Sequence, residues 1–214
     1  MNITIFGASG AIGHLLMEIA LDNGDLVTAY VRNTKKIKIN HSNLRLVRGE
    51  LSDTPAIETA VAEADVVIST MGPPNDISRK LKGTPIADGH DLIIKALKKF
   101  NKRRFITLAT PALQSKDDKK NLSTVLPGIL AKLFLPNGYA EMKKMERIIK
   151  QSNLDWTVVR IINPNIKHNG QLYGYSIGNQ SAKLSVSREN VAKFIYSTIG
   201  QGTLIRKMPI VYNN

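Results

Sequence analysis

Three glycines near the start of the sequence have a spacing that suits phosphate binding. Gly7, Gly10 and Gly13 form a G-x-x-G-x-x-G pattern between a short apolar run and the start of a helical pattern. Glycines in such a turn let the backbone approach a phosphate closely, and the free N–H groups of the first helical turn attract its charge. The turn therefore predicts a nucleotide-phosphate site, although glycines also serve plain packing where a strand meets a helix.

A second group has the residue types needed for proton transfer. Tyr139 and Lys143 are four residues apart, which places both on one face of a predicted helix. An ammonium near a phenol favours the phenolate and lowers the phenol pKa, so such a tyrosine can exchange a proton as a hydride moves at a carbonyl. Thr110 follows a predicted strand and could hydrogen-bond the same substrate oxygen. An exposed helix face is the alternative interpretation, and Lys144 is an equally plausible lysine.

A third signal is the end of the second predicted strand, where Arg32 and Asn33 follow Val31. An acidic residue near this position binds the ribose 2′-hydroxyl of NAD, whereas an arginine accommodates the 2′-phosphate of NADP. The sequence therefore favours NADP(H), with Lys35 and Lys36 either adding positive potential or lying in a solvated loop.

The elements that must position these residues alternate along the chain. The spacing predicts strands at 2–6, 26–31, 44–48, 65–69, 104–108 and 156–161, and helices at 11–22, 54–63, 86–100 and 138–152. This order predicts an α/β fold with a doubly wound parallel sheet of the Rossmann-like kind. Ligands bind at the carboxyl ends of such strands, which adds Ala109 to the candidate groove. Residues 111–136 form an irregular insertion, interpreted as a lid, a dimer contact or both.

The pattern changes in the C-terminal part of the chain. Residues 165–185 hold only short apolar segments, 187–199 read as a helix capped by Ser187, and 204–211 suit one edge strand. We therefore expect residues 1–214 to form a single domain, in which 163–214 provide a small cap that faces the substrate.

Composition excludes several classes of chemistry. The 214 residues include no cysteine, which excludes disulfides, thiolate zinc sites and cysteine nucleophiles. The four histidines lack ligand-like spacing, so no metal is expected. With no signal peptide or membrane-spanning run, a cytoplasmic location is expected. The net charge of +13 suits an anionic substrate, a nucleic acid, an acidic membrane surface or mere solubility. We expect a small-molecule substrate, no nucleic acid or membrane partner, and a monomer or homodimer.

Several motifs together resemble a known family. They are GASGAIG at 7–13, the Arg32-Asn33 strand end, GELSD at 49–53, STMG at 69–72, RFI at 104–106, SNLDWTVVR at 152–160 and SRENVA at 187–192. This combination is similar to the atypical short-chain dehydrogenase/reductases, and within them to the NAD(P)H-binding branch of NmrA-like regulators and biliverdin/flavin reductases.

The resemblance implies a role for each matching residue. The pyrophosphate would be lined by Gly7, Ser9, Gly10, Ala11 and Ile12, with Gly13 packing the helix. Arg32 would bind the 2′-phosphate, and Glu50 and Leu51 would border the adenine. The remaining positions are Thr70, Met71 and Gly72 beneath the ribose and pyrophosphate, Pro164 beside the nicotinamide, and Thr110, Tyr139 and Lys143 at the catalytic positions.

Three functions are compatible with this pattern. The first is an NADPH-dependent oxidoreductase that reduces a small carbonyl, quinone, flavin or enone-like acceptor by hydride transfer. The second is a redox sensor that binds NADP(H) without turnover. An epimerase-like enzyme is weaker, because such relatives need a larger substrate domain than residues 163–214 provide.

Overall fold

The computed structural model describes residues 1–72, 83–110, 113–119, 136–165, 167, 170–178 and 185–214. An eight-stranded sheet forms its centre, with the strand order β3-β2-β1-β4-β5-β6-β10-β8. Its strands are β1 (Asn2–Phe6), β2 (Leu26–Val31), β3 (Leu44–Arg48), β4 (Val66–Ser69), β5 (Arg104–Ala109), β6 (Asp155–Ile161), β8 (Tyr173–Ser176) and β10 (Ile210–Asn213). All the pairings are parallel except that of β8 with β10.

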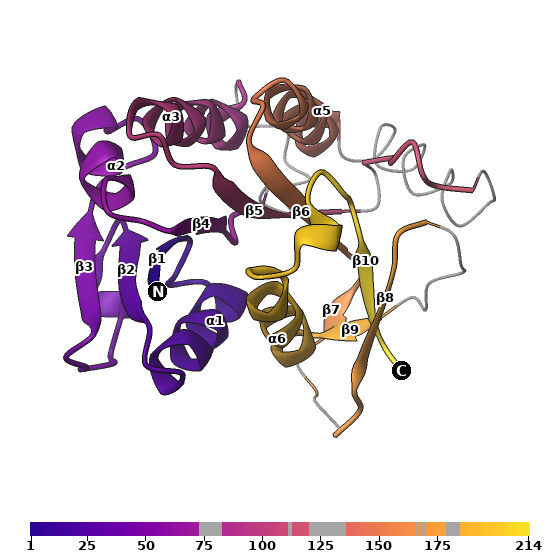
Figure 1. Ribbon diagram of the computed structural model, residues 1–214, viewed down its shortest axis with the longest axis horizontal. Coiled ribbons are helices and arrows are strands. Elements are labelled where there is room, and N and C mark those ends of the chain that lie inside the picture. Colours follow the sequence, from indigo (N-terminus) through magenta and orange to yellow (C-terminus); the bar gives the residue numbers. More distant parts are fainter. Residues whose placement is uncertain (73–82, 111–112, 120–135, 166, 168–169, 179–184) are drawn as a thin grey trace.

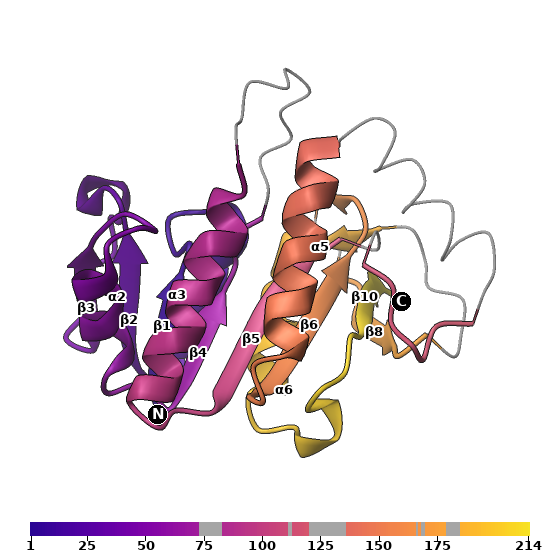
Figure 2. The ribbon, with the colours of Figure 1, turned by 90° about the horizontal axis from the view of Figure 1, so that it is seen from above.

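Helices cover both faces of the sheet (Figure 1). They are α1 (Ala11–Asp22), α2 (Thr54–Val61), α3 (Pro85–Lys99), α5 (Pro136–Lys150) and α6 (Arg188–Thr198), with short 3-10 turns at Thr34–Lys36 (η1) and Gly202–Leu204 (η2). Helices α1 and α6 pack on one face, whereas α2, α3 and α5 pack on the other. Figure 2 shows α3 and α5 side by side above the sheet. The predicted doubly wound Rossmann-like fold is therefore confirmed.

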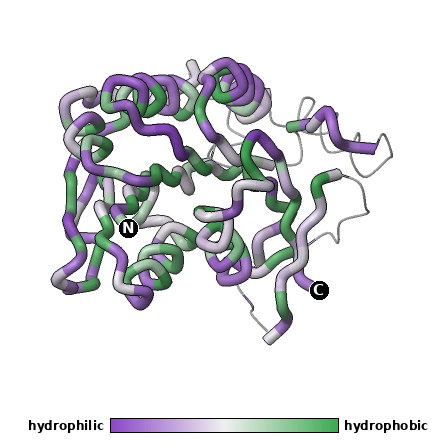
Figure 3. Tube along the Cα trace, in the orientation of Figure 1, coloured by the Kyte–Doolittle hydropathy of each residue, from purple (hydrophilic) through white to green (hydrophobic). Residues whose placement is uncertain are grey.

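The alternation of side chains along the strands explains the two packed layers. On β1 and β4, Ile5 and Ile68 point into the cluster with α1 and α6. Phe6 and Val67, their neighbours in sequence, point into the cluster with α2, α3 and α5. Because both faces of these strands are buried, apolar residues occupy consecutive positions, as in Ile5-Phe6 and Val66-Val67-Ile68. Figure 3 shows the same strands as the hydrophobic centre of the molecule.

The predicted elements from residue 2 to 110 agree closely with those observed. Helix α2 ends at Val61 rather than residue 63, and α3 covers Pro85–Lys99 rather than 86–100. Helix α5 begins at Pro136, two residues before its predicted start, and most of the predicted irregular insertion at 111–136 lies outside the described residues.

The C-terminal strands differ from the sequence-based prediction. Strand β10 lies between β6 and β8, so the prediction of an edge strand there was wrong. Strand β8 was missed because its sequence, YGYS, has the composition of a loop. A Cβ on Gly174 would lie 2.5 Å from Asn214 Oδ1 and 2.7 Å from the Tyr212 ring, so a larger residue there would require these side chains to move.

Much of the segment predicted to form the cap completes the main sheet instead. Strands β8 and β10 extend that sheet, and α6 packs beside α1. A separate two-stranded sheet pairs β7 (Pro164–Asn165) with β9 (Val186–Ser187). The single-domain organisation and the cap's contact with substrate stay predictions.

Two arginines, Arg104 half-buried and Arg160 fully buried, join distant parts of the chain. Arg104 donates to the carbonyl oxygens of Thr198 (2.6 Å) and Ile199 (3.2 Å) at the end of α6. Burial lowers the pKa of Arg104 to about 10. Arg160, which is 1% exposed, makes a two-pronged ion pair with Asp118 at 2.6 and 2.7 Å. These contacts fix the end of α6 and the segment after β5 to the sheet.

Candidate functional site

The glycine turn between β1 and α1 is shaped by close backbone contacts. Gly7 has φ +84°, a conformation that favours glycine, and its carbonyl oxygen accepts the Gly10 N–H at 2.9 Å. A Cβ on Gly13 would lie 2.3 Å from the Gly7 oxygen and 2.7 Å from Thr70 Oγ1. The Thr70 hydroxyl lies 3.1 Å from the Gly7 carbonyl oxygen, to which it donates. The end of β4 is thus tied to the turn.

The first turn of α1 has no capping side chain. Its N-cap residue, Gly10, offers none, and no acidic residue occurs in the first turn. Helices α2 and α6 differ, because Asp53 accepts the Ala56 N–H and Ser187 accepts the Asn190 N–H. The amides at the start of α1 are therefore open to an external anion, which a helix N-terminus attracts.

A cavity of about 830 Å³ opens beside this turn, at the carboxyl ends of β1, β2, β3 and β4. Its volume lies within the range of small-molecule and cofactor sites. Its lining includes the predicted residues Gly7, Ser9, Gly10, Arg32, Glu50, Leu51, Thr70, Met71 and Gly72. The structure therefore brings most of the predicted dinucleotide groove into one cavity.

Tyr30 holds the loop that follows β3. Its hydroxyl donates to the Glu50 carbonyl oxygen at 2.7 Å, and its ring packs on Phe6 with centroids 4.7 Å apart. A Cβ on Gly49 would lie 2.1 Å from the Tyr30 hydroxyl oxygen. Burial, with Asp53 and Glu50 nearby, raises the pKa of Tyr30 to about 12, so the phenol remains a donor. The sequence signal was an aromatic residue with a polar tip in an otherwise mostly aliphatic strand.

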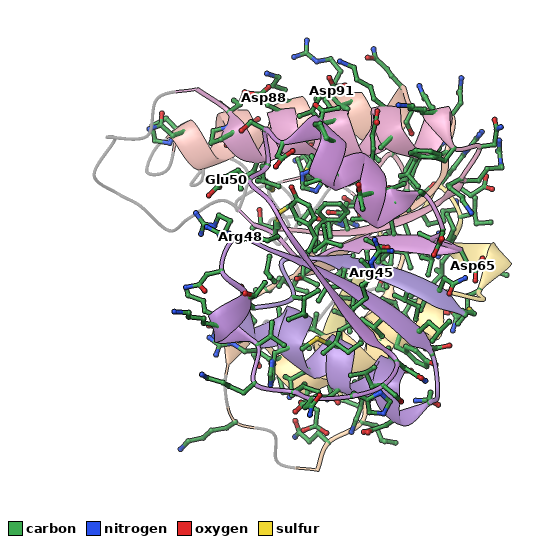
Figure 4. All side chains as sticks on the ribbon, turned by 90° about the vertical axis from the view of Figure 1, so that its left-hand side faces the viewer. Arg45, Arg48, Glu50, Asp65, Asp88 and Asp91 are labelled. Atoms are coloured by element: carbon green, nitrogen blue, oxygen red, sulfur yellow. The ribbon has the colours of Figure 1, made fainter. Side chains whose placement is uncertain are left out.

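The charges at the cavity have both signs. Arg32 is exposed, and among the described residues no ion pair engages it. Figure 4 shows Glu50 and Asp88 on the same side of the molecule, with Arg48 close by. Asp88 is already paired with Lys144 at 2.5 Å. Arg32 is therefore the available cation of the lining for an anionic group.

Asn33 has a local structural role. Its side-chain oxygen accepts the Lys35 N–H at 3.0 Å and caps η1. It does not contribute to the cavity lining, although Arg32 beside it does. Its predicted contact with the cofactor gains no support from this placement.

The other predicted cofactor residues are not part of the cavity lining. Ala11, Ile12 and Gly13 form the first turn of α1, where their backbone amides are the relevant groups. Ala109 is buried at the end of β5, and Pro164 lies in β7, paired with Val186.

The predicted catalytic residues lie outside this cavity. Thr110 is exposed after β5, and Tyr139 is half-buried in the first part of α5. Lys143 Nζ is 2.6 Å from Glu146 Oε2, and Lys150 binds the other oxygen of that carboxylate. Although burial disfavours the Glu146 anion, these two lysines hold its pKa below the usual value. Among the described residues no hydrogen bond joins Tyr139 to Thr110 or Lys143, so their joint action stays a prediction.

His90 is a structural residue of the core. It is fully buried, and burial lowers its pKa to about 4, so the ring is neutral at physiological pH. Nδ1 donates to the Ile86 carbonyl oxygen at 2.7 Å, which leaves Nε2 to accept from the Thr107 hydroxyl at 3.1 Å. Over the described residues, no group of three potential metal ligands occurs and no helix is long and apolar enough to cross a membrane.

One wall of the cavity was missed by the sequence analysis. It comes from the beginning of α3, through Pro85, Ile86, Asp88, Gly89 and Leu92. The available signal was topological: a Thr-Pro helix start follows the strand-end segment at 69–72, and helix starts on neighbouring strands gather at the same edge of a parallel sheet.

The fold and the cavity define a dinucleotide-binding protein of the Rossmann-like class. A sequence comparison agrees, because residues 7–201 match the NAD(P)H-binding family. The chain belongs to this family.

Solved structures of low sequence identity share the whole fold. A short-chain dehydrogenase/reductase from Veillonella parvula, solved with NADP, is 24% identical, with a TM-score of 0.80 over 99% of this chain and 94% of that one. ChuY, an anaerobillin reductase from Escherichia coli O157:H7, is 20% identical, with a TM-score of 0.79 over 99% and 97%. At these identities the two structures show that this chain shares their Rossmann-like fold.

A curated relative matches over a shorter stretch. The probable pinoresinol-lariciresinol reductase 3 of Arabidopsis thaliana is 31% identical over 84 residues. The match covers 37% of this chain and 28% of the relative.

Proposed function

We propose that this protein is an NADPH-dependent reductase of a small carbonyl, quinone, flavin or enone-like acceptor. The observation that carries the proposal is the open N-terminus of α1 beside a cavity that also contains Arg32. The amides of Ala11, Ile12 and Gly13 would hold the pyrophosphate, and Arg32 the 2′-phosphate. Glu50 and Leu51 would border the adenine. When bound, NADPH supplies the hydride for the reduction.

Residues at the end of β5 and in the first part of α5 would carry out the proton transfer. Thr110 would orient the substrate oxygen, and the Tyr139 phenol would donate a proton to it. Lys143 would place its ammonium beside the Tyr139 hydroxyl, which requires that ammonium to leave Glu146 or to be shared with it. The ion pair with Glu146 is also the observation that favours the second candidate function, an NADP(H)-binding sensor without turnover.

One assay separates these two functions. We expect purified protein to bind NADPH and to oxidise it, measured by absorbance at about 340 nm, with at least one member of a panel of quinones, flavins, aldehydes and enones. The Tyr139→Phe variant should bind NADPH normally but lose about 100-fold or more in kcat, in keeping with the loss of a general acid. Tight binding without oxidation across the panel would support the sensor. Unchanged turnover in the variant would remove Tyr139 from the mechanism.

The assignment of NADP(H) has its own test. Arg32→Glu should weaken NADPH binding by about 100-fold, because it removes a charged hydrogen bond to the 2′-phosphate and adds repulsion. NADH has no 2′-phosphate, so its Kd should change far less; both constants are measured by fluorescence titration.

Arg45→Glu is the matched control for this charge reversal. Arg45 is exposed on β3, and Figure 4 shows it away from Arg48 and Glu50. The control should leave both dissociation constants nearly unchanged. Equal losses of NADPH and NADH binding in Arg32→Glu would contradict the 2′-phosphate contact.

A further inference from the structure

Helix α3 begins without a cap of its own. The side chain of its N-cap residue, Thr84, caps no backbone amide, and its hydroxyl donates instead to Asp88 Oδ2 at 3.3 Å. The two free amides are bound instead by Glu141 of α5: Oε1 accepts the Ile86 N–H at 3.1 Å, and Oε2 accepts the Ala87 N–H at 2.8 Å. A carboxylate at a helix N-terminus is stabilised by the helix dipole as well as by these bonds. Helix α5 thus supplies the cap of α3.

A second contact lies one turn further along α5. Lys144 Nζ is 2.5 Å from Asp88 Oδ1 and 2.8 Å from Thr84 Oγ1, so it binds the N-cap residue of α3 and a side chain one turn later. Glu141 is 5% exposed, and it is one of the buried carboxylates that sequence analysis did not single out. We call Glu141 and Lys144, with their partners on α3, the α3–α5 clamp.

The first turn of α3, which the α3–α5 clamp holds, forms one wall of the dinucleotide cavity. Ile86 and Asp88, which the clamp holds, line the cavity together with Gly89. On its other side the turn touches the loop after β3, because a Cβ on Gly89 would lie 3.0 Å from Leu51 Cβ. The position of α3 between α5 and Leu51 therefore sets the width of the cavity.

The clamp also distinguishes the two helix N-termini that border the cavity. Both would attract an anion, but Glu141 already occupies that of α3, whereas that of α1 has no cap. A phosphate near α3 would meet a buried carboxylate, which disfavours binding there. The pyrophosphate is thereby directed to the glycine turn.

From these contacts we propose that Glu141 is a positioning residue for the dinucleotide. It fixes the adenosine-side wall of the cavity by capping α3, and it keeps the α3 N-terminus from competing for phosphate. This inference rests on the proposed binding of NADPH. It adds that tight binding depends on α5, the helix that also carries Tyr139.

The test compares Glu141→Gln with Glu58→Gln. The first substitution keeps the shape of the side chain but leaves one oxygen and no charge to face two amides. The second removes a carboxylate 2.6 Å from Lys99, at the opposite end of α3. We expect Glu141→Gln to raise the Kd for NADPH about tenfold, the effect of weakening charged hydrogen bonds. Glu58→Gln should change it less than about twofold, because exposed ion pairs contribute little.

Fragments of the cofactor separate a positioning role from a general loss of stability. Glu141→Gln should weaken 2′,5′-ADP, which fills only the adenosine side, by the same factor as NADPH. Denaturant unfolding without ligand reports the stability of each variant. If Glu141→Gln does not fold, Lys144→Met, which breaks the other half of the clamp, replaces it. Its rise in both dissociation constants should exceed that of Glu58→Gln but stay below tenfold, because the Lys144–Asp88 pair is largely exposed.

The outcomes are distinguishable from failure of the proposed function. If the unaltered protein does not bind NADPH or 2′,5′-ADP, the proposed function fails first. If it binds both and Glu141→Gln binds them equally well, the positioning role is wrong while the function stands. Equal losses in Glu141→Gln and Glu58→Gln would also overturn it, because α3 would then act only through general stability.

Discussion

Gly13→Ala is expected to abolish tight binding of the dinucleotide while leaving a folded, less stable protein. The added Cβ would lie 2.3 Å from the Gly7 oxygen, 2.7 Å from Thr70 Oγ1 and 2.9 Å from Ala8 Cα. Two of these neighbours are backbone atoms, which cannot rotate away. Helix α1 must therefore move off the turn, which displaces the amides that face the phosphates.

The expected size of this effect follows from two costs. Overpacking a tight contact costs about 1 to 3 kcal/mol of the free energy of unfolding. A displacement of about 1 Å in a catalytic site lowers the reaction rate about 100-fold. We expect a rise of similar size in the Kd for NADPH. Denaturant unfolding and fluorescence titration measure the two effects.

Gly200→Ala is the control, because a Cβ there meets nothing within 4 Å. It should leave the Kd for NADPH unchanged. If the Gly13→Ala variant bound NADPH normally, the close approach of α1 to the glycine turn would not matter for binding.

We expect Arg160→Met to lower the free energy of unfolding more than any other single substitution proposed. Arg160 is buried on β6, where it binds Asp118 and donates to the carbonyl oxygens of Leu113 (3.0 Å) and Met208 (2.8 Å). Methionine leaves the Asp118 carboxylate, whose side chain is 6% exposed, without its charge partner. Breaking such a pair costs about 3 to 5 kcal/mol, which denaturant unfolding measures.

A double-mutant cycle shows how this loss arises. Asp118→Leu alone should also be strongly destabilising, because it leaves a buried guanidinium. The combination with Arg160→Met should cost clearly less than the sum of the two, since no unpaired charge remains. Additive losses would show that the two side chains do not depend on each other, contrary to their distances of 2.6 and 2.7 Å.

The strands and helices of the N-terminal half were predictable because their signals are local. Apolar runs such as that of β4 lie within the element that they define. The glycine turn and Arg32 were predictable for the same reason. Each contributes to the cavity from the end of its own strand.

What the sequence did not reveal depends on partners far along the chain. The cap of α3 is Glu141, 54 and 55 residues from the amides that it binds, and no local pattern marks such a residue. Strand β8 has the composition of a loop, and the strand with which it pairs, β10, follows much later in the chain.

The placement of β10 has a kinetic consequence. Strand β8 is hydrogen-bonded within the main sheet to β10, which comes after α6 and pairs with β6 on its other side. Strand β10 comes after α6, so bringing it back to β8 costs loop-closure entropy before the hydrogen bonds of the two strands compensate for it. We therefore expect β8 and β10 to join the sheet late in folding, and this edge to open first when the native protein fluctuates.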